Sequence, residues 1–400
     1  MSGTGGLLTI APDDRPVTRP AGSTRRSPDS PAVVPATGSL APGRTGARHK
    51  GNGLGTGMVE SLELGPFVLQ SGHRFPDLRV AFRHDGPGPE TAPQVLVVHA
   101  LTGSADAAGS WWEPMVGPGR ALDTTRVGVL CANLLGGCYG STGPTSVDPA
   151  TGAPYGDAFP VVTSRDQARA QWALLDALGI ERLALVTGGS LGGMVALEVG
   201  AERPGATAAV VPIAAPLAVS GLALAWNAIQ LELVERYGSD GLDLARRLAM
   251  TTYRSETDFD GRFGRAREDD GRFSVASYLA HQGRKLVARF DPATYRVLVG
   301  AMDHHDLGAG RGGQSAALGT QAGGGVRVTG VGIEGDILYG PRQVRALVAA
   351  CRRAGVPARY REIATAKGHD AFLVEWEQLG RILGEALAEA EAQGPSRADE

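Results

Sequence analysis

Short apolar runs alternate with longer amphipathic runs along most of this chain, and polar or glycine-rich stretches separate them. Apolar runs of this length indicate strands buried on both faces of a sheet, and the longer runs indicate helices. Strands that alternate with helices predict a mostly parallel central sheet flanked by helices, an α/β fold. We predict strands at 94–101, 126–133, 183–186, 208–214, 326–333 and 358–363, and helices at 164–178, 341–354 and 371–392.

The alternation stops between residues 216 and 324, where no run is a convincing strand. The amphipathic runs in this stretch predict helices at 222–236, 241–253 and 275–290. We interpret 216–324 as a helical lid inserted between two parts of one core, 57–215 and 325–392. At the start of the first part, we expect 67–69 and 78–82 to form an antiparallel pair of strands.

Both ends of the chain lack the pattern of a folded segment. Residues 1–56 are rich in Gly, Pro, Ser, Thr, Ala and Arg and contain no Phe, Trp or Tyr. Such a segment buries too little apolar surface to offset its loss of entropy on folding, so we predict a disordered tail there and a polar tail at 393–400. We find no apolar core of a secretory signal in 1–56 and no uninterrupted apolar run that approaches a membrane span of about 18 residues.

Composition narrows the classes of function. The formal net charge is −3 and charged residues make up 20% of the chain, which gives no sign of nucleic-acid or membrane-surface binding. The three cysteines are odd in number and not in metal-ligand spacing, so we expect free thiols, no metal site and a cytoplasmic protein.

The segment 188–192 matches the pattern G-x-S-x-G, with Ser190 at its centre. Because the chain has 58 glycines, this short match alone is weak. It gains weight from the apolar strand predicted before it and the Ala-, Val- and Leu-rich helix predicted after it, since a strand–turn–helix around this pattern is the nucleophile elbow of hydrolases. The amide of Leu191, at the start of that helix, could then stabilise an oxyanion.

An acid and a base follow Ser190 in the order expected for an α/β-hydrolase. Asp336 comes just after the predicted strand 326–333, and His369 comes just after 358–363. Open α/β sheets place their sites at the carboxyl ends of strands, so the three side chains are expected to meet as a Ser–His–Asp triad. Taken singly, Asp336 could be a turn residue and His369 a hydrogen-bonded loop histidine.

Several other residues are candidates of less weight. In this fold, the loop after the strand 94–101 supplies a second oxyanion amide, which we assign to Leu101, whereas His99 is expected to be a packed, hydrogen-bonded residue. The segment 308–313 matches G-x-G-x-x-G, but no strand precedes it. The four residues 303–306 read Asp-His-His-Asp, but neighbouring side chains point apart, so they are not expected to hold one ion.

Together these residues give the chain a resemblance to the homoserine O-acyltransferase family of α/β-hydrolase-fold enzymes, which includes the homoserine O-acetyltransferases. The resemblance runs from about residue 67 to residue 387. It is carried by the segments 99–103, 111–112, 115–119, 136–144, 159–163, 188–194, 277–279, 282–283 and 289–291, by Lys285, and by 368–373.

The resemblance implies a ping-pong reaction in which Ser190 takes an acetyl group from acetyl-CoA and passes it to L-homoserine, in methionine biosynthesis. It implies no bound cofactor beyond this co-substrate, and a homodimer formed through the lid helices. In the family an Arg and a Tyr seven residues later help to bind the amino acid, as does the Asp after the catalytic His. Here Arg246, Tyr253 and Asp370 occupy those places, and the neighbouring Arg247 is the alternative to Arg246.

Alternatives remain open at this stage. The segment 235–241 is shorter than is usual in the family, which leaves the amino acid uncertain. The acceptor could be serine or another alcohol, the donor could be succinyl-CoA, and an esterase would transfer the acyl group to water.

Overall fold

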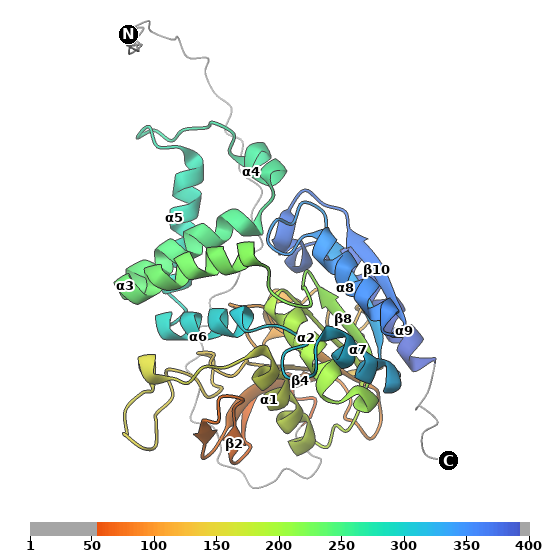
Figure 1. Ribbon diagram of the computed structural model, residues 1–400. Helices are drawn as coiled ribbons and strands as arrows, with labels where there is room; N and C mark the ends of the chain where they lie inside the picture. The colour runs from red at the N-terminus through yellow and green to blue at the C-terminus, as the bar shows by residue number, and fades with distance from the viewer. Residues whose placement is uncertain (1–53, 393–400) are drawn as a thin grey trace, which may run out of the picture. The chain divides into compact units, whose positions relative to one another are not determined.

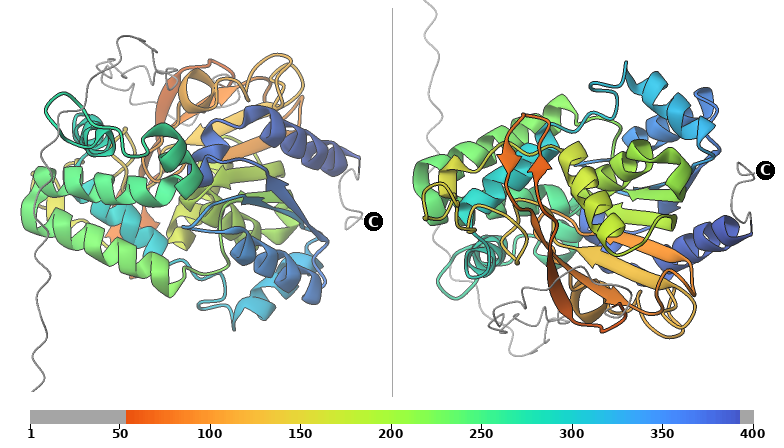
Figure 2. Two further views of the ribbon diagram at one scale, coloured as in Figure 1. Left: turned by 90° about the horizontal axis from the view of Figure 1, so that it is seen from above. Right: turned by 90° about the horizontal axis from the view of Figure 1, so that it is seen from below.

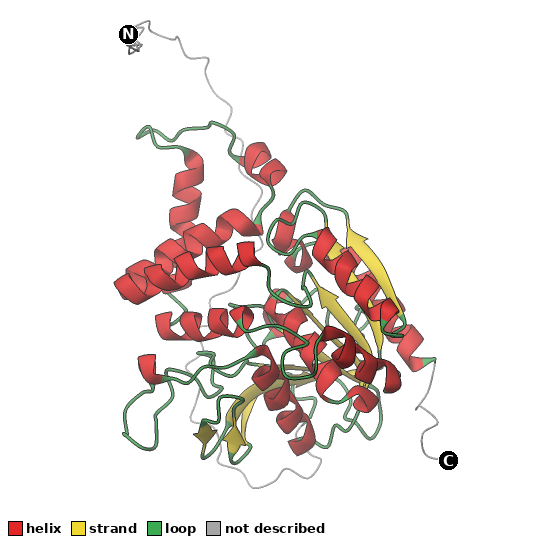
Figure 3. Ribbon diagram, in the orientation of Figure 1, coloured by secondary structure: helices red, strands yellow, loops and turns green. Residues whose placement is uncertain are grey.

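The computed structural model describes residues 54–392. An eight-stranded sheet lies at the centre of this part of the chain, with helices around it (Figures 1 and 3). The sheet has the order β1-β4-β6-β5-β7-β8-β9-β10. Neighbouring strands are parallel from β6 to β10, and β4 is antiparallel to both β6 and β1, so the prediction of a mostly parallel sheet is confirmed. The strands are β1 (Val59–Glu63), β4 (Arg79–Asp85), β5 (Gln94–Val98), β6 (Gly128–Ala132), β7 (Leu183–Gly189), β8 (Thr207–Ile213), β9 (Arg327–Ile333) and β10 (Ala358–Ile363).

The tail predicted at 1–56 lies almost wholly outside the described residues, and the tail predicted at 393–400 lies entirely outside them.

Helices cover both faces of the sheet. The helices α1 (Ser164–Ala177), α2 (Leu191–Glu202), α7 (Gln314–Gly323) and α8 (Pro341–Arg353) contribute to one apolar cluster, and α9 (Trp376–Glu391) contributes to the other. Both faces of β5 and β6 are buried, which explains why the two strands have almost no polar positions. The sheet therefore presents the carboxyl ends of six parallel strands along one edge.

The predicted pairing of 67–69 with 78–82 is wrong. The strand β4 pairs with β1, whereas β2 (Phe67–Val68) forms a separate hairpin with β3 (Arg74–Phe75). Gly72 closes that hairpin with φ +86, a conformation that favours glycine. The apolar pattern missed β1 because this edge strand is only partly buried, so its sequence, VESLE, is half polar.

The closing helix begins later than the predicted residue 371. A 3₁₀ segment at Gly368–Leu373 comes first, and α9 starts at Trp376. The carbonyl of Phe372 accepts a hydrogen bond from the indole of Trp112 (2.9 Å), and that of Leu373 accepts one from the indole of Trp376 (2.7 Å). These carbonyls therefore serve tryptophan side chains, which ends the turn that carries His369 before the helix begins.

Four helices follow β8 and precede α7: α3 (Gly221–Tyr253), α4 (Glu256–Arg262), α5 (Ser274–Val287) and α6 (Pro292–Asp303). Gly238, at φ +56 and ψ −122, divides α3 into two arms that lie side by side (Figure 2). A Cβ at Gly241 would lie 1.9 Å from the carbonyl oxygen of Leu233, so glycine permits the close packing of the arms. Within 54–392, no helix combines the length and apolar character needed to cross a membrane.

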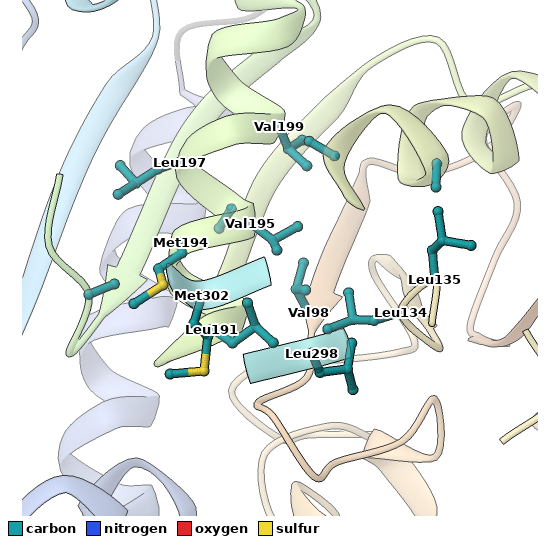
Figure 4. Packing of buried hydrophobic residues seen from close by; sticks show 14 of the residues in the cluster. Val98, Leu134, Leu135, Leu191, Met194, Val195, Leu197, Val199, Leu298 and Met302 are labelled. Atoms are coloured by element: carbon teal, nitrogen blue, oxygen red, sulfur yellow. The ribbon is translucent and has the colours of Figure 1, made fainter. Parts of the chain in front are cut away.

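The helix α6 rests on the start of α2. Leu298 and Met302 of α6 belong to the same buried cluster as Leu191 and Met194 of α2 and lie beside them (Figure 4). The inserted helices thus cover the first turn of α2, which directly follows Ser190. That they act as a lid stays a prediction.

Candidate active site

Ser190 stands at the sharp turn between β7 and α2, at φ +58 and ψ −124. A non-glycine residue at positive φ is strained by about 1–3 kcal/mol and persists only where its surroundings hold it. The backbone around Ser190 does so, because its amide donates to the carbonyl of Ile213 (2.9 Å) and its carbonyl accepts from Met194 (3.0 Å). A Cβ at Gly192 would lie 2.2 Å from the carbonyl oxygen of Val98, so the turn requires glycine there.

Asp336 and His369 lie together, as the sequence predicted from their places after β9 and β10. The Nδ1 atom of His369 is 2.8 Å from Oδ2 of Asp336, and both residues are buried. The other oxygen of Asp336 accepts hydrogen bonds from the amides of Leu338 (2.8 Å) and Tyr339 (3.1 Å), which fix the carboxylate. The Nε2 atom of His369 is buried and has no hydrogen-bond partner among residues 54–392.

The charge of Asp336 sets the protonation behaviour of His369. Burial alone would lower the pKa of His369, but attraction to the Asp336 carboxylate and the hydrogen bond between them outweigh burial, and the pKa is raised above its usual value of 6.5. The pair therefore stabilises an imidazolium, as a general base needs once it has accepted a proton.

Three aromatic rings surround the imidazole of His369. The ring of Tyr253, at the end of α3, is 5.7 Å away between centroids, that of Tyr339 is 5.6 Å away and that of Phe372 is 5.7 Å away. They come from an inserted helix, from the loop of Asp336 and from the histidine's own turn. The sequence assigned no role to Tyr339 or Phe372, although Phe372 lies in the segment 368–373 that carries the resemblance.

The two amides proposed for an oxyanion are placed at the edge where Ser190 lies. Leu191 is the first residue of α2, so its amide has no acceptor within the helix. Leu101 follows β5 in a turn, and its amide has no acceptor among the described residues. Both leucine side chains are buried and apolar, so the backbone amide is the group through which each residue could stabilise an oxyanion.

His99 is a structural histidine, as expected. Its Nδ1 bonds to the carbonyl of Ala100 (2.8 Å), and its Nε2 accepts a hydrogen bond from the amide of Leu134 (3.0 Å). Burial lowers the pKa of His99 to about 4, against the raising effect of the Ala100 carbonyl, so the ring is neutral. With both nitrogens engaged, His99 shapes the turn before Leu101 and is not free to take a proton from a serine.

Arg246 and Tyr253 lie against each other near His369. The guanidinium carbon of Arg246 is 5.2 Å from the centre of the Tyr253 ring, which in turn packs on His369. Arg246 makes no ion pair with any residue of 54–392, whereas Arg247 is paired with Asp243 of the same helix. The two neighbouring arginines are thus distinct, and Arg246 is the one with a free charge.

Asp370 lies directly after His369 and is 3.4 Å from Nε of Arg254. This contact could not be predicted from sequence, because Arg254 is one of many charged residues between residues 216 and 324. Burial raises the pKa of the nearby Tyr253 hydroxyl, and the Arg246 charge opposes this only in part. Tyr253 is therefore neutral, and its hydroxyl keeps a proton that it can donate.

The Asp-His-His-Asp segment does not converge on one point. His305 bonds to the hydroxyl of Ser164 and the carbonyl of Pro216, both at 3.0 Å, whereas His304 bonds to the carbonyl of Gly300 at 2.7 Å. Within the described residues, no three His, Cys, Asp or Glu side chains are grouped as metal ligands would be.

Comparisons with known proteins show the family and the fold to which this chain is similar. The alpha/beta hydrolase fold family matches residues 93–299. A homoserine O-acetyltransferase from Moorella thermoacetica is 42% identical over 351 residues, covering 80% of this chain and 93% of that protein. The crystal structure of a homoserine O-acetyltransferase from Staphylococcus aureus is 30% identical with a TM-score of 0.71, covering 82% of this chain and 95% of that chain.

An acetylester hydrolase from Corynebacterium glutamicum shares the fold at 22% identity, with a TM-score of 0.72 over 83% of this chain and 96% of that chain. The fold alone is therefore common to transferases and hydrolases. Identity of about two residues in five over nearly the full length of a relative is a closer relationship: the chain belongs to the homoserine O-acetyltransferase family of α/β-hydrolase-fold proteins.

Proposed function

We propose that this protein transfers an acetyl group from acetyl-CoA to the hydroxyl of L-homoserine, a step of methionine biosynthesis, through an acetyl-serine at Ser190. The observation that carries the proposal is the strained turn of Ser190 at the edge of the sheet where the His369–Asp336 pair lies. Membership of the homoserine O-acetyltransferase family supports the choice of donor and acceptor.

In the first half-reaction, the Ser190 hydroxyl attacks the thioester carbonyl of acetyl-CoA while His369 accepts its proton. The amides of Leu101 and Leu191 stabilise the oxyanion of the tetrahedral intermediate. When the intermediate collapses, the carbon–sulfur bond breaks and His369 returns the proton to the thiolate of CoA. The charge of Asp336 stabilises the imidazolium at both stages.

In the second half-reaction, the hydroxyl of homoserine gives its proton to His369 and attacks the acetyl-serine. The new tetrahedral intermediate expels Ser190, which regains the proton. The product is O-acetylhomoserine, and the enzyme returns to its starting state. No resident metal or cofactor takes part, and acetyl-CoA enters as a co-substrate.

The amino-acid end of homoserine is bound by Arg246, Tyr253 and Asp370. The unpaired guanidinium of Arg246 is suited to the α-carboxylate, and the carboxylate of Asp370 is suited to the α-ammonium. Tyr253 connects this clamp to His369, against which its ring packs. An acceptor without these two charges would lose both contacts, so the clamp favours an amino acid over water or a simple alcohol.

The protein acts as a homodimer formed through α3 and works in the cytoplasm. Leu222, Ile229 and Tyr237 of α3 are 58%, 50% and 56% exposed, an unusual density of large exposed apolar side chains on one helix. The biosynthetic role of the family and the three free cysteines support the location.

One assay tests the proposed reaction. The purified full chain is mixed with acetyl-CoA or succinyl-CoA and with homoserine, serine or no amino acid, and release of free thiol is followed. We expect release to be fastest with acetyl-CoA and homoserine and to yield O-acetylhomoserine. Equal release without an amino acid would identify a hydrolase, and a preference for succinyl-CoA or serine would correct the donor or acceptor.

A further inference from the structure

The short junction between α3 and α4 packs against two loops, the one that carries Asp336 and the one that carries His369. Its two residues are Arg254 and Ser255, and Ser255 is only 5% exposed. A Cβ at Gly368 would lie 2.6 Å from the backbone nitrogen of Ser255, and a Cβ at Gly335 would lie 3.2 Å from the Cβ of Ser255. Each of these glycines directly precedes a residue of the pair, so Ser255 of the junction fills the space beside both loops.

The backbone of both glycines is of a kind that other residues rarely adopt. Gly335 has φ +69 and Gly368 has φ +72. Glycine is therefore favoured at both positions by the backbone conformation, and at Gly368 also by the space that the backbone of Ser255 takes. Two loops that are far apart in sequence are thus shaped to receive the same contact.

The hydroxyl of Ser255 joins the junction to the loop of His369. It donates a hydrogen bond to the carbonyl of Ala366, three residues before His369. The same oxygen accepts a hydrogen bond from the amide of Asp258 (3.0 Å), so it also caps the start of α4. A movement of α4 would therefore be transmitted directly to the turn that carries His369.

The guanidinium of Arg254 joins the junction to Asp370. Its Nε lies 3.4 Å from Oδ2 of Asp370, and its Nη1 lies 3.7 Å from Oδ2 of Asp258 in α4. The side chains of Arg254, Asp258 and Asp370 are at most 17% exposed, so water screens their charges less than it would on an open surface. Arg254 therefore forms ion pairs both with Asp370, in the turn of His369, and with Asp258, at the start of α4.

We propose that Arg254 and Ser255 form a positioning junction through which the inserted helices set the places of His369 and Asp370. Ser255 positions His369, and Arg254 positions Asp370. Neither residue touches the reacting atoms, so each acts through the residue that it holds. This inference rests on the roles of His369 and Asp370 in the proposed function.

The two residues are expected to affect different half-reactions. His369 acts in both halves, so loosening its turn slows the formation of acetyl-serine as well as its transfer. In the proposed function Asp370 binds the amino acid and neither acetyl-CoA nor Ser190, so releasing it from Arg254 is expected to weaken the use of homoserine and to leave formation of acetyl-serine intact. A residue with a merely structural role would lower stability without separating the two steps.

The first experiment uses Ser255→Ala, with Thr251→Ala as the matched control. Thr251 lies four residues earlier and bonds only to the carbonyl of Leu248 in its own helix. The burst of thiol on mixing enzyme with acetyl-CoA alone reports acylation, measured well below the melting temperature of each variant. We expect Ser255→Ala to slow the burst roughly tenfold or more, the factor that corresponds to the free energy of one hydrogen bond. Thr251→Ala should leave the burst unchanged. A burst in Ser255→Ala as fast as in the wild type would overturn the role of Ser255.

The second experiment compares Arg254→Gln with Arg254→Lys. We expect Arg254→Gln to raise KM for homoserine roughly tenfold with the acylation burst unchanged, and Arg254→Lys to recover part of the loss because it keeps the charge. An unchanged KM in Arg254→Gln, or a loss confined to the burst, would overturn the role of Arg254. If wild-type enzyme shows the burst but no transfer to homoserine, the proposed acceptor is wrong, while the Ser255 result still stands on the burst alone.

Discussion

The Nδ1 atom of His369 lies 2.8 Å from Oδ2 of Asp336, and this contact leaves Nε2 of the same ring, buried and without a partner among residues 54–392, as the nitrogen free to exchange a proton. Asp336 cannot turn away from the imidazole easily, because its other oxygen is held by two backbone amides. The tautomer with the proton on Nδ1 is therefore fixed by the fold before any substrate binds.

The first prediction concerns pH. A protonated His369 cannot accept the proton of Ser190, so acylation is expected to be lost as pH falls through the raised pKa of His369, above 6.5. Asp336→Asn removes the attraction that raises this pKa, so burial dominates and the acid limb of the profile moves to lower pH. The rate at the plateau should also fall by about 10⁴-fold, because the tautomer is no longer fixed. The measurement is kcat/KM for acetyl-CoA against pH in both proteins.

The same pair has a consequence for stability. A histidine whose pKa is raised in the folded state stabilises the fold fully below its unfolded value of 6.5, and this contribution is lost as pH rises through the folded pKa. Asp336→Asn should therefore be destabilised more at pH 6 than at pH 9, relative to the wild type. The kinetic prediction has its own test. If the acid limb of the kcat/KM profile stayed in place in Asp336→Asn, a group other than His369 would control that profile.

The second prediction concerns the covalent intermediate. Ser190→Ala should keep the fold and lose acetyl transfer by about 10⁴-fold or more, because no other hydroxyl is held in the strained turn. With wild-type enzyme and acetyl-CoA alone, mass spectrometry of the digested protein should find one acetyl group on the peptide that contains Ser190. Double-reciprocal plots that intersect, together with an unlabelled peptide, would favour direct transfer in a ternary complex.

The third prediction concerns the amino-acid clamp. Arg246→Ala should weaken the use of homoserine by about 10- to 150-fold, the range for one charge-assisted hydrogen bond, and should leave acylation nearly unchanged. Arg247→Ala is the matched control, because Arg247 is a neighbouring arginine already paired with Asp243. The measurement is kcat/KM for homoserine at saturating acetyl-CoA. If both variants lose homoserine use equally, the effect comes from the helix and not from the charge of Arg246.

The parts of the fold that depend on burial on both faces could be predicted from sequence. The strands β8 and β9 were predicted to within one residue of their observed bounds, because nearly every residue of each strand is buried and the sequence of each is a largely apolar run. The half-exposed strand β1 was missed, since its sequence, VESLE, contains no apolar run. The start of α9 was misplaced because two tryptophan side chains take the carbonyls that a longer helix would use.

The candidate site shows the same division. The positions of Ser190, Asp336 and His369 follow from their places after strands, because parallel strands bring their carboxyl ends to one edge. The contacts of Arg254 and Ser255 could not be predicted, because they depend on how an inserted helix packs on two loops. The glycines before Asp336 and His369 are the sequence feature that is consistent with a close approach of another segment to these two loops.

The last prediction concerns assembly through α3. Leu222 and Ile229 are seven residues apart and therefore lie on one face of the first arm of α3, where both are at least half exposed. In a two-fold symmetric dimer each residue enters the interface twice, so Ile229→Glu would bring two like charges into an apolar contact. We expect the wild type to have twice its chain mass of 41.4 kDa by light scattering, and Ile229→Glu to dissociate at micromolar concentration. Val147→Glu is the control, because Val147 is 61% exposed but lies outside the inserted helices, and it should stay dimeric. A monomeric wild type, or an Ile229→Glu variant that remains a dimer, would assign the exposed face of α3 to some other role.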